Sequence, residues 1–330
     1  KPLQIKLPRM LRGLKTAGGE SRTGGRPERR KSMLLPKFNY HEPSSVDEAT
    51  RLMGEIGGEA SVLAGGTDLL VNMKMGKTAP KHVVSLSRIQ ELRGVRREQG
   101  ALALGACLTA GELKEQEEIK AEFNGLCQSA GSLGSPLIRN LATVGGNIVT
   151  ARPAADLPPS LMAYGASILL RKKNGERRLP LESFFKGPGQ TLIEPEEILC
   201  AVILNEPPPY SGGGYAKLGV RKALEISLVN VAAFMVLDGP NGPIKEARIV
   251  LGAVAPAPVR SPSAEAVLMG GRPDDALFEK AGNAASKDAK PIDDFRGSAE
   301  YRREMVKVLT RRALKLAYEE AKLRELRRWK

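Results

Sequence analysis

Apolar and polar positions follow one another along most of this chain in short, regular blocks. Brief apolar runs closed by glycine, proline or charged residues predict strands, and apolar positions at helical spacing predict the helices between them. Because the two kinds of block alternate, we expect short βα units and an α/β arrangement in the first two thirds of the chain. The expected strands there are residues 60–64, 82–86, 95–105 as a hairpin, 166–171, 176–180 and 198–204, and the expected helices are residues 45–56, 88–92, 108–113 and 121–131.

A proline run, Glu206-Pro207-Pro208-Pro209, interrupts this pattern and is the clearest linker in the chain. Strands expected beyond it are separated by turn residues, so they should form a three-stranded antiparallel sheet, with amphipathic helices covering it. These strands are residues 215–220, 227–238 and 244–254, and the helices are residues 263–269, 277–285 and 298–329. We therefore predict one domain at residues 33–206 and a smaller one at residues 207–330.

Charge is distributed unevenly, with most of the excess at the start of the chain. The formal net charge is +14, and residues 1–32 hold ten Lys or Arg against Glu20 and Glu28, which leaves +6 for the other 298 residues. Scattered Gly and Pro without an apolar period are typical of disorder, so we interpret residues 1–32 as a basic extension before Met33, a candidate natural start. Without a hydrophobic region or interleaved aromatic residues, this extension indicates neither an export signal nor a nucleic-acid-binding arm.

Several kinds of site chemistry find no support in the sequence. Cys107, Cys127 and Cys200 are isolated in apolar segments, which predicts buried thiols and a reducing, cytoplasmic compartment. No run approaches the ~18 apolar residues that cross a membrane. The chain has no GxGxxG motif, and its two histidines, His41 and His82, suggest no catalytic constellation. We assign no catalytic residue and no metal ligand, so any redox chemistry has to be carried by a cofactor.

The first of two glycine stretches joins an expected strand to an expected helix. Residues 60–64 are apolar, Gly65 and Gly66 interrupt them, and Thr67 is a candidate N-cap for the helix that follows. A glycine turn at a helix N-terminus offers free N–H groups and the positive end of the helix dipole, which suits an anion such as a phosphate. The alternative is a plain turn with nothing bound.

The second stretch runs from Leu133 to Asp156 and is the richest in polar groups. In residues 143–147 the glycine pair permits positive φ and close backbone approach, so that consecutive N–H groups could point into one concavity. Thr143 and Asn147 would add side-chain hydrogen bonds, and Asp156 would accept hydrogen bonds from ligand hydroxyls. The alternative is a Gly-Gly turn between two strands with a solvated carboxylate behind it.

Four motifs in order give a resemblance to a known family. They are AGGTDLL at 64–70, ATVGGNIVTARPAADLPPSLMAYGA at 142–166, PEEIL at 195–199 and YAKLGVRKALEISLVNVA at 215–232. Together they resemble the FAD-binding medium subunits of molybdenum hydroxylases of the xanthine dehydrogenase and carbon monoxide dehydrogenase type, over roughly residues 33–325. The resemblance implies an α+β fold: a two-subdomain FAD-binding domain of the vanillyl-alcohol-oxidase-like type, α/β in its N-terminal part, and a small C-terminal flavoprotein domain.

The resemblance also implies positions for FAD contacts. In similar subunits the diphosphate lies against both glycine stretches, an acidic residue contacts adenosine hydroxyls, and apolar residues lie near the adenine and the isoalloxazine ring. The implied cofactor-binding residues are Val62, Leu63, Ala64, Gly65, Gly66, Thr67, Asp68 and Leu69 in the first stretch, Thr143, Val144, Gly145, Gly146 and Asn147 in the second, and Leu133, Asp156, Leu199, Lys217 and Ile226 elsewhere. On the residues alone, Leu133, Leu199 and Ile226 could equally be core residues, and Lys217 could be a solvated strand residue.

The implied role is electron transfer within a complex. Similar subunits take electrons from [2Fe–2S] clusters in a small subunit, after substrate oxidation at a molybdenum-pterin cofactor in a large subunit, and pass them to NAD, a quinone, ferredoxin or oxygen. The resemblance implies a dimer of heterotrimers, with the flavin ring at the surface between the two domains. Two other hypotheses stay open: a self-sufficient FAD-dependent oxidase or dehydrogenase with its own small substrate, and a basic nucleic-acid-associated protein with degenerate glycine turns.

Overall fold

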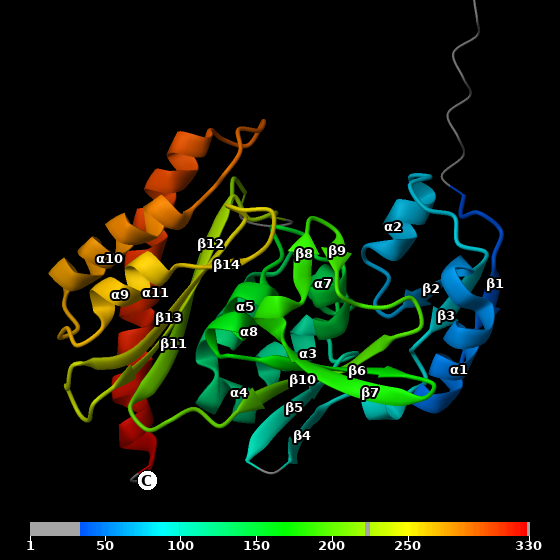
Figure 1. Cartoon of the computed structure of the whole chain (residues 1–330), viewed down its shortest axis with the longest axis horizontal. Coiled ribbons are helices and arrows are strands. Elements are labelled where there is room, and N and C mark those ends of the chain that lie inside the picture. Colours follow the sequence, from blue (N-terminus) through cyan, green and yellow to red (C-terminus); the bar gives the residue numbers. More distant parts are fainter. Residues whose placement is uncertain (1–33, 99, 222–224, 329–330) are drawn as a thin grey trace, which may run out of the picture. The chain divides into compact units, whose positions relative to one another are not determined.

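A computed structural model describes residues 34–98, 100–221 and 225–328. The described residues from Leu35 onward form one compact unit, which contains three main sheets and the helices that pack on them (Figure 1). The predicted basic extension and Met33 lie outside the described residues.

The first sheet is parallel and carries the first glycine stretch at the end of one strand. Its strands are β1 (Asn39–His41), β2 (Ala60–Leu63) and β3 (His82–Ser85), in the order β1-β3-β2. Helix α1 (Val46–Ile56) connects the first two and begins as predicted, because the Ser45 side chain accepts a hydrogen bond from the Glu48 amide. It ends at Gly57, whose φ of 68° favours glycine. Helix α2 (Leu69–Lys74) follows the glycine turn.

The second sheet is antiparallel and lies in the middle of the unit (Figure 1). Its five strands have the order β4-β5-β10-β6-β7, and the outer pair β6-β7 is a hairpin of the two strands predicted at residues 166–171 and 176–180, joined by a turn at Asn174-Gly175. The strands are β4 (Val95–Glu98), β5 (Ala101–Gly105), β6 (Ser167–Lys172), β7 (Gly175–Pro180) and β10 (Ile198–Asn205). A small separate ladder joins β8 (Phe185–Gly187) to β9 (Gln190–Thr191), in a segment where no strand was predicted.

Short helices between β5 and β6 carry the second glycine stretch. They are α3 (Ala110–Glu115), α4 (Glu117–Glu122), α5 (Asn124–Ser132), α6 (Pro136–Arg139), α7 (Val144–Val149) and α8 (Leu157–Ala163). The single helix predicted at residues 121–131 is instead the end of α4 and all of α5, with buried Phe123 between them. Single-turn 3-10 helices occur at Gly57–Glu59, Gln90–Leu92 and Leu181–Ser183.

The C-terminal sheet has four strands, where three were predicted. They are β11 (Ser211–Leu218), β12 (Val229–Leu237), β13 (Ile244–Gly252) and the two-residue β14 (Val259–Arg260), paired in that order and antiparallel. Strand β11 begins four residues before the prediction, because Gly212 and Gly214 leave room for a helix: a Cβ there would lie 2.2 Å from the Ala317 oxygen and 2.3 Å from the Ala313 oxygen.

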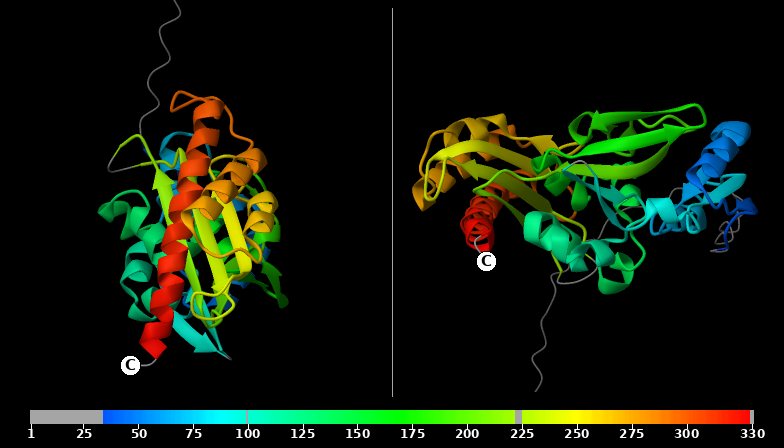
Figure 2. Two further views of the ribbon diagram at one scale, coloured as in Figure 1. Left: turned by 90° about the vertical axis from the view of Figure 1, so that its left-hand side faces the viewer. Right: turned by 90° about the horizontal axis from the view of Figure 1, so that it is seen from below.

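Helices lie on both faces of this sheet. On one face are α9 (Pro262–Leu268), α10 (Asp275–Asp288) and α11 (Ala299–Arg328), and on the other are α5 and α8 (Figure 2). Strand β12 is buried along its whole length, so its alternating side chains enter two different cores. Val231 and Ala233 belong to a core shared with α10 and α11, whereas Ala232 and Phe234 belong to a core shared with α5, α8 and the second sheet. One core thus extends across the predicted linker at residues 206–209.

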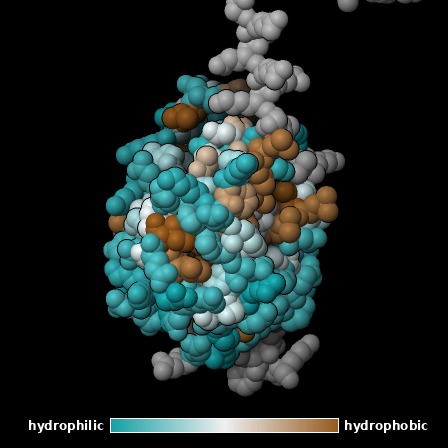
Figure 3. All heavy atoms as spheres, turned by 90° about the vertical axis from the view of Figure 1, so that its right-hand side faces the viewer, coloured by the Kyte–Doolittle hydropathy of each residue, from teal (hydrophilic) through white to brown (hydrophobic). Residues whose placement is uncertain are grey.

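The surface shown in Figure 3 is mainly hydrophilic, with apolar residues gathered in a few patches. Large apolar side chains that are exposed among the described residues include Val71 on α2, Met75 just after it and Leu137 on α6. Cys107, Cys127 and Cys200 are buried free thiols, as predicted. Within the described ranges, no helix combines the length and apolar character needed to cross a membrane.

Candidate functional site

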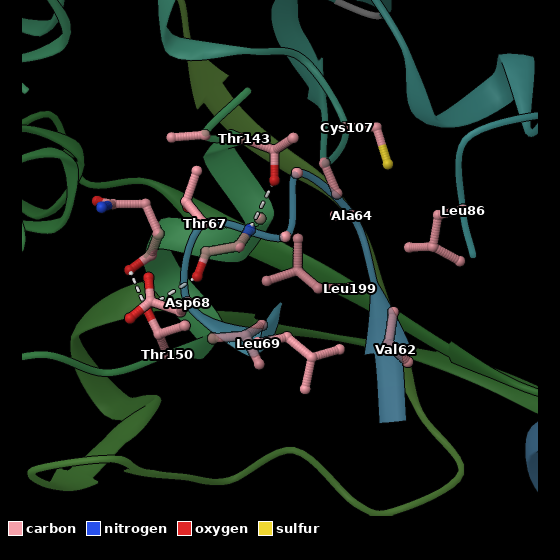
Figure 4. Close-up of a pocket in the computed structure, with 18 of the residues that line it drawn as sticks. Val62, Ala64, Thr67, Asp68, Leu69, Leu86, Cys107, Thr143, Thr150 and Leu199 are labelled. Carbon is pink, nitrogen blue, oxygen red and sulfur yellow. Dashed lines mark hydrogen bonds between the residues drawn. The ribbon is translucent and has the colours of Figure 1, made fainter. Parts of the chain in front are cut away.

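The two glycine stretches, about 80 residues apart in the sequence, line one cavity. This first cavity has a volume of about 170 Å³ and lies between the β2–α2 turn, α7 and the start of β10 (Figure 4). Predicted residues contribute most of its lining. They are Val62, Ala64, Gly65, Gly66, Thr67, Asp68, Leu69, Thr143, Gly145, Gly146, Asn147 and Leu199.

Gly65 joins the two stretches directly. A Cβ at this position would lie 1.7 Å from the carbonyl oxygen of Leu141 and 2.6 Å from its carbonyl carbon, so only glycine allows the two backbones to approach this closely. Gly66 is required for a different reason, since its φ of 73° lies in the left-handed region. The first glycine turn therefore fits the close approach and positive φ expected of such a turn.

The first turn presents unpaired backbone donors. Within the described part of the chain, the N–H groups of residues 65–68 donate no hydrogen bond, whereas the Leu70 N–H already bonds the Gly66 oxygen at 3.1 Å. The prediction of Thr67 as the N-cap is wrong: α2 begins at Leu69, and Asp68 occupies the cap position without a side-chain hydrogen bond. Because the helix begins later than predicted, a longer run of free amides precedes it. These amides can bind an anionic group.

The second stretch works differently from the prediction. Gly145 and Gly146 lie in α7 without positive φ, and the amides of residues 144–147 already bond Leu108, Ala106 and Thr143. Gly145 instead allows packing, because a Cβ there would lie 2.8 Å from the Ala106 Cβ. Thr143 caps α7 by accepting a hydrogen bond from the Gly146 amide at 3.1 Å. This stretch therefore supplies a closely packed wall rather than an open ring of amides.

A second, larger cavity adjoins the first. Its volume is about 790 Å³, and it shares Asp68, Asn147 and Thr150 with the first cavity. Three other predicted residues, Leu133, Asp156 and Ile226, line it. Leu133 and, in the first cavity, Leu199 are nearly buried, whereas Ile226 is 57% exposed. Interpreting Ile226 as a core residue is therefore wrong, and Leu133 and Leu199 belong at once to the core and to the cavity walls.

Asp156 is the centre of a buried polar network beside the second cavity. Its carboxylate accepts hydrogen bonds from the hydroxyls of Tyr215 at 2.7 Å and Ser227 at 2.8 Å, and the Lys217 ammonium lies 2.9 Å away. Burial raises the pKa of the Asp156 carboxyl, and the ammonium and the two hydroxyls act in the opposite direction. The carboxylate therefore already has three partners within the protein.

Lys217 is not a solvated strand residue. Its side chain is nearly buried, and its ammonium also bonds the carbonyl oxygens of Ser132 at 3.0 Å and Glu225 at 3.2 Å. It does not line either cavity, and the same holds for the predicted residues Leu63 and Val144. Lys217 thus contacts Asp156 and the residue before Leu133 without itself facing the cavity.

Several residues that line the first cavity were not predicted from the sequence. Thr150, Cys107, Leu86, Ile193 and Glu197 line it. They come from separate elements, so only tertiary contacts bring them together. Burial raises the pKa of the Cys107 thiol to about 11, which keeps this residue a neutral apolar wall. Glu197 falls within the PEEIL motif, which was the one signal for it.

The two adjoining cavities have the donor set that FAD requires. Free amides at residues 65–68 suit a diphosphate, apolar walls suit aromatic rings, and Asp68, Asn147 and Thr150 offer polar atoms where the cavities join. The combined space is in the range of cavities that hold large ligands. Among the described residues, no group of three or more His, Cys, Asp or Glu side chains could hold a metal ion.

Comparison with protein families gives matches over most of the chain. Residues 36–207 match the family model described as the FAD binding domain in molybdopterin dehydrogenase. Residues 215–317 match the model described as the CO dehydrogenase flavoprotein C-terminal domain. The first match covers both glycine stretches and the whole first cavity, so FAD is the cofactor of this chain.

Individual relatives agree with the family models. The carbon monoxide dehydrogenase medium chain of Hydrogenophaga pseudoflava is 33% identical over 286 residues, which cover 87% of this chain and 99% of the relative. The putative xanthine dehydrogenase FAD-binding subunit of Escherichia coli strain K12 is 31% identical over 278 residues, or 84% of this chain and 94% of the relative. Both have nearly the same length as the matched region.

Solved structures share the fold. A chain of carbon monoxide dehydrogenase from Hydrogenophaga pseudoflava superposes with a TM-score of 0.82 at 33% identity, covering 87% of this chain and 99% of that one. A chain of quinoline 2-oxidoreductase from Pseudomonas putida 86 gives a TM-score of 0.82 at 26% identity, covering 88% and 99%. The cavity, the family models and these relatives agree, and the chain belongs to the family of FAD-binding medium subunits of the molybdenum hydroxylases.

Proposed function

We propose that this chain is the electron-transfer subunit of a molybdenum-containing hydroxylase or dehydrogenase. In this proposal it receives electrons from [2Fe–2S] clusters of a small subunit, after substrate oxidation at a molybdenum-pterin cofactor in a large subunit. It delivers them to an external acceptor, which is NAD, a quinone, ferredoxin or oxygen. The observation that carries the proposal is the pair of adjoining cavities, the first of which is lined by the turn with free amides at residues 65–68.

Each part of the chain has a binding role in this proposal. The amides of residues 65–68 hold the diphosphate of FAD, while Gly65 and Gly66 keep the turn open enough for it to approach. Leu199, Leu133 and Ile226 form apolar surfaces for its rings. When bound, FAD supplies the conversion between one-electron and two-electron chemistry. The chain excludes water and fixes orientation, so we assign it no catalytic acid, base or nucleophile.

Surface features beside the first cavity support a partner there. Helix α2 starts at cavity residue Leu69, and Val71 on this helix and Met75 just after it are exposed. Helix α6 leads to cavity residue Ala142 and exposes Leu137. Exposed apolar side chains on elements that border a site are typical of protein contacts. We propose that the iron–sulfur subunit covers this surface, within a cytoplasmic dimer of heterotrimers.

The domain boundary also remains a proposal. We place it at about residue 207, in the proline run between β10 and β11, with the FAD-binding domain before it and the flavoprotein C-terminal domain after it. The two family matches, at residues 36–207 and 215–317, support this position.

The test is anaerobic reduction of the complex by its own substrate. We expect the flavin absorbance to fall only when the large and small subunits are present, and reoxidation on adding the acceptor. The alternative, a self-sufficient FAD-dependent oxidase, predicts that the isolated chain reduces its flavin with a small substrate. Flavin that stays oxidised in a complex whose iron–sulfur clusters become reduced would contradict the electron-transfer role.

A further inference from the structure

One wall of the first cavity is a short turn between β9 and β10. Ile193, Ile198 and Leu199 from this turn and the strand after it line the cavity, and so does Glu197. The Glu197 side chain is only 2% exposed. A carboxylate this buried needs hydrogen-bond donors and a positive charge, because burial of an unpaired charge is strongly unfavourable. The position of the wall therefore depends on whatever holds this carboxylate.

Arg177, on the outer strand β7 of the second sheet, holds both sides of the turn. Its Nε donates to Glu197 Oε1 at 2.6 Å and its Nη2 donates to Glu197 Oε2 at 2.8 Å, a two-pronged contact. The same Nη2 also donates to the carbonyl oxygen of Leu192 at 2.7 Å, at the other end of the turn. One guanidinium thus holds both ends of the turn, Leu192 and Glu197, next to the cavity residues Ile193 and Ile198.

Backbone hydrogen bonds complete the turn around the same carboxylate. The Glu194 amide donates to Glu197 Oε2 at 2.8 Å, and the Glu197 amide donates to the Glu194 oxygen at 3.0 Å. Burial disfavours the ionised form, but the Arg177 guanidinium and the Glu194 amide outweigh it and hold the pKa of the Glu197 carboxyl below its ordinary value. Lysine could not replace Arg177, because an ammonium lacks the planar fork that reaches these acceptors together.

We propose that Arg177 is a positioning residue of the FAD site: acting through Glu197, it sets the apolar wall of the first cavity against the glycine turn. The proposal rests on the assignment of FAD to this cavity. Arg177 does not line the cavity itself, and its own side chain is 41% exposed, so its effect on the cofactor is indirect. Loss of the guanidinium would leave Glu197 buried without its cation, and the turn would have to rearrange to hydrate the carboxylate.

The test compares Arg177→Ala and Arg177→Lys with a control residue, Lys172 on β6, that contacts the same turn. Lys172 forms an exposed ion pair with Glu194 at 2.8 Å, so Lys172→Ala removes a positive charge that contacts the turn without unpairing a buried group. The dissociation constant of FAD is measured on each apoprotein by flavin fluorescence, at a temperature where circular dichroism shows every variant folded. Millimolar guanidinium ion is added in a parallel titration.

We expect Arg177→Ala to weaken FAD binding about tenfold or more, Arg177→Lys to weaken it to a smaller degree, and Lys172→Ala to change it less than about twofold. Guanidinium ion should restore part of the affinity of Arg177→Ala and leave Lys172→Ala unchanged. Wild-type affinity in a folded Arg177→Ala or Arg177→Lys protein would overturn the proposal, as would an equal loss in Lys172→Ala. Failure of the wild-type chain to bind FAD would instead overturn the assignment of the cavity.

Discussion

Substitution of Gly65 by alanine is the most informative change to the cofactor site. The added Cβ would lie 1.7 Å from the Leu141 oxygen, whereas real Cβ contacts do not fall below 3.0 Å. The first glycine turn and the segment at Leu141 must therefore separate by more than about 1 Å. Because both contacting groups are backbone, no side-chain rotation can relieve the clash.

The expected losses of stability and of FAD affinity follow from this clash and from the hydrogen bonds that the turn offers. Overpacking of this kind lowers the free energy of unfolding by about 1–3 kcal/mol. The free amides of residues 65–68 would move with the turn, and each lost hydrogen bond to a charged group weakens binding by about 1.5–3 kcal/mol. Loss of two such bonds corresponds to about a hundredfold or larger rise in the dissociation constant of FAD.

The assay measures FAD affinity and urea unfolding on the apoproteins of Gly65→Ala and a matched control, Gly58→Ala. Gly58 lies in the same part of the chain, and a Cβ there meets nothing within 4 Å. We expect the control to match wild type in both measurements. A folded Gly65→Ala protein with wild-type FAD affinity would refute the reasoning that the first turn holds the diphosphate.

Three further changes probe other parts of the site. Gly146 lines the first cavity, so Gly146→Val places a branched side chain where FAD should bind and should prevent its binding. The fold should be kept, because a Cβ there meets only the Thr143 hydroxyl, at 2.8 Å; wild-type flavin content in the purified variant would show that α7 does not face the cofactor. Asp156→Ala should weaken FAD binding by about 1.5–3 kcal/mol and also destabilise the apoprotein, because it leaves buried Lys217 unpaired; unchanged affinity would remove Asp156 from the site. The folded-state pKa of Glu197 lies below its ordinary value of 4.5, so its contribution to stability is present above about pH 4.5 and is lost as the pH falls through the folded-state pKa. Urea unfolding as a function of pH should therefore show a smaller loss on acidification for Glu197→Gln than for wild type, and identical pH profiles would contradict this.

Local signals in the sequence predicted much of the fold. The Ser45 cap and Gly57 stop of α1, and the Asn174-Gly175 turn between β6 and β7, depend on residues close together in the chain. Strand β11 was predicted too short because its glycines indicate a turn, whereas they make room for α11. The α7 helix was missed for a similar reason, since a glycine pair is unfavourable within a helix unless close packing requires it.

The site was predicted in part, and the rest depends on tertiary contacts. Residues of both glycine stretches do line one cavity, but no sequence rule indicates that the Leu141 carbonyl lies against Gly65. Asp156 was expected to face ligand hydroxyls, and its bonds to Tyr215 and Ser227 appear only when the C-terminal sheet packs beside α8. The Arg177–Glu197 pair joins strand β7 to the turn before β10, and a lone charged pair gives no signal in one sequence.

The central claim is that this chain carries FAD within an electron-transfer complex. The most direct measurement is gentle native purification, followed by an absorbance spectrum, determination of the FAD content per chain, and identification of the chains that co-purify. We predict a flavin spectrum with one FAD per chain, together with one large molybdenum-containing subunit and one small iron–sulfur subunit. Flavin without partners would contradict the complex, and absence of flavin would contradict the cofactor site itself.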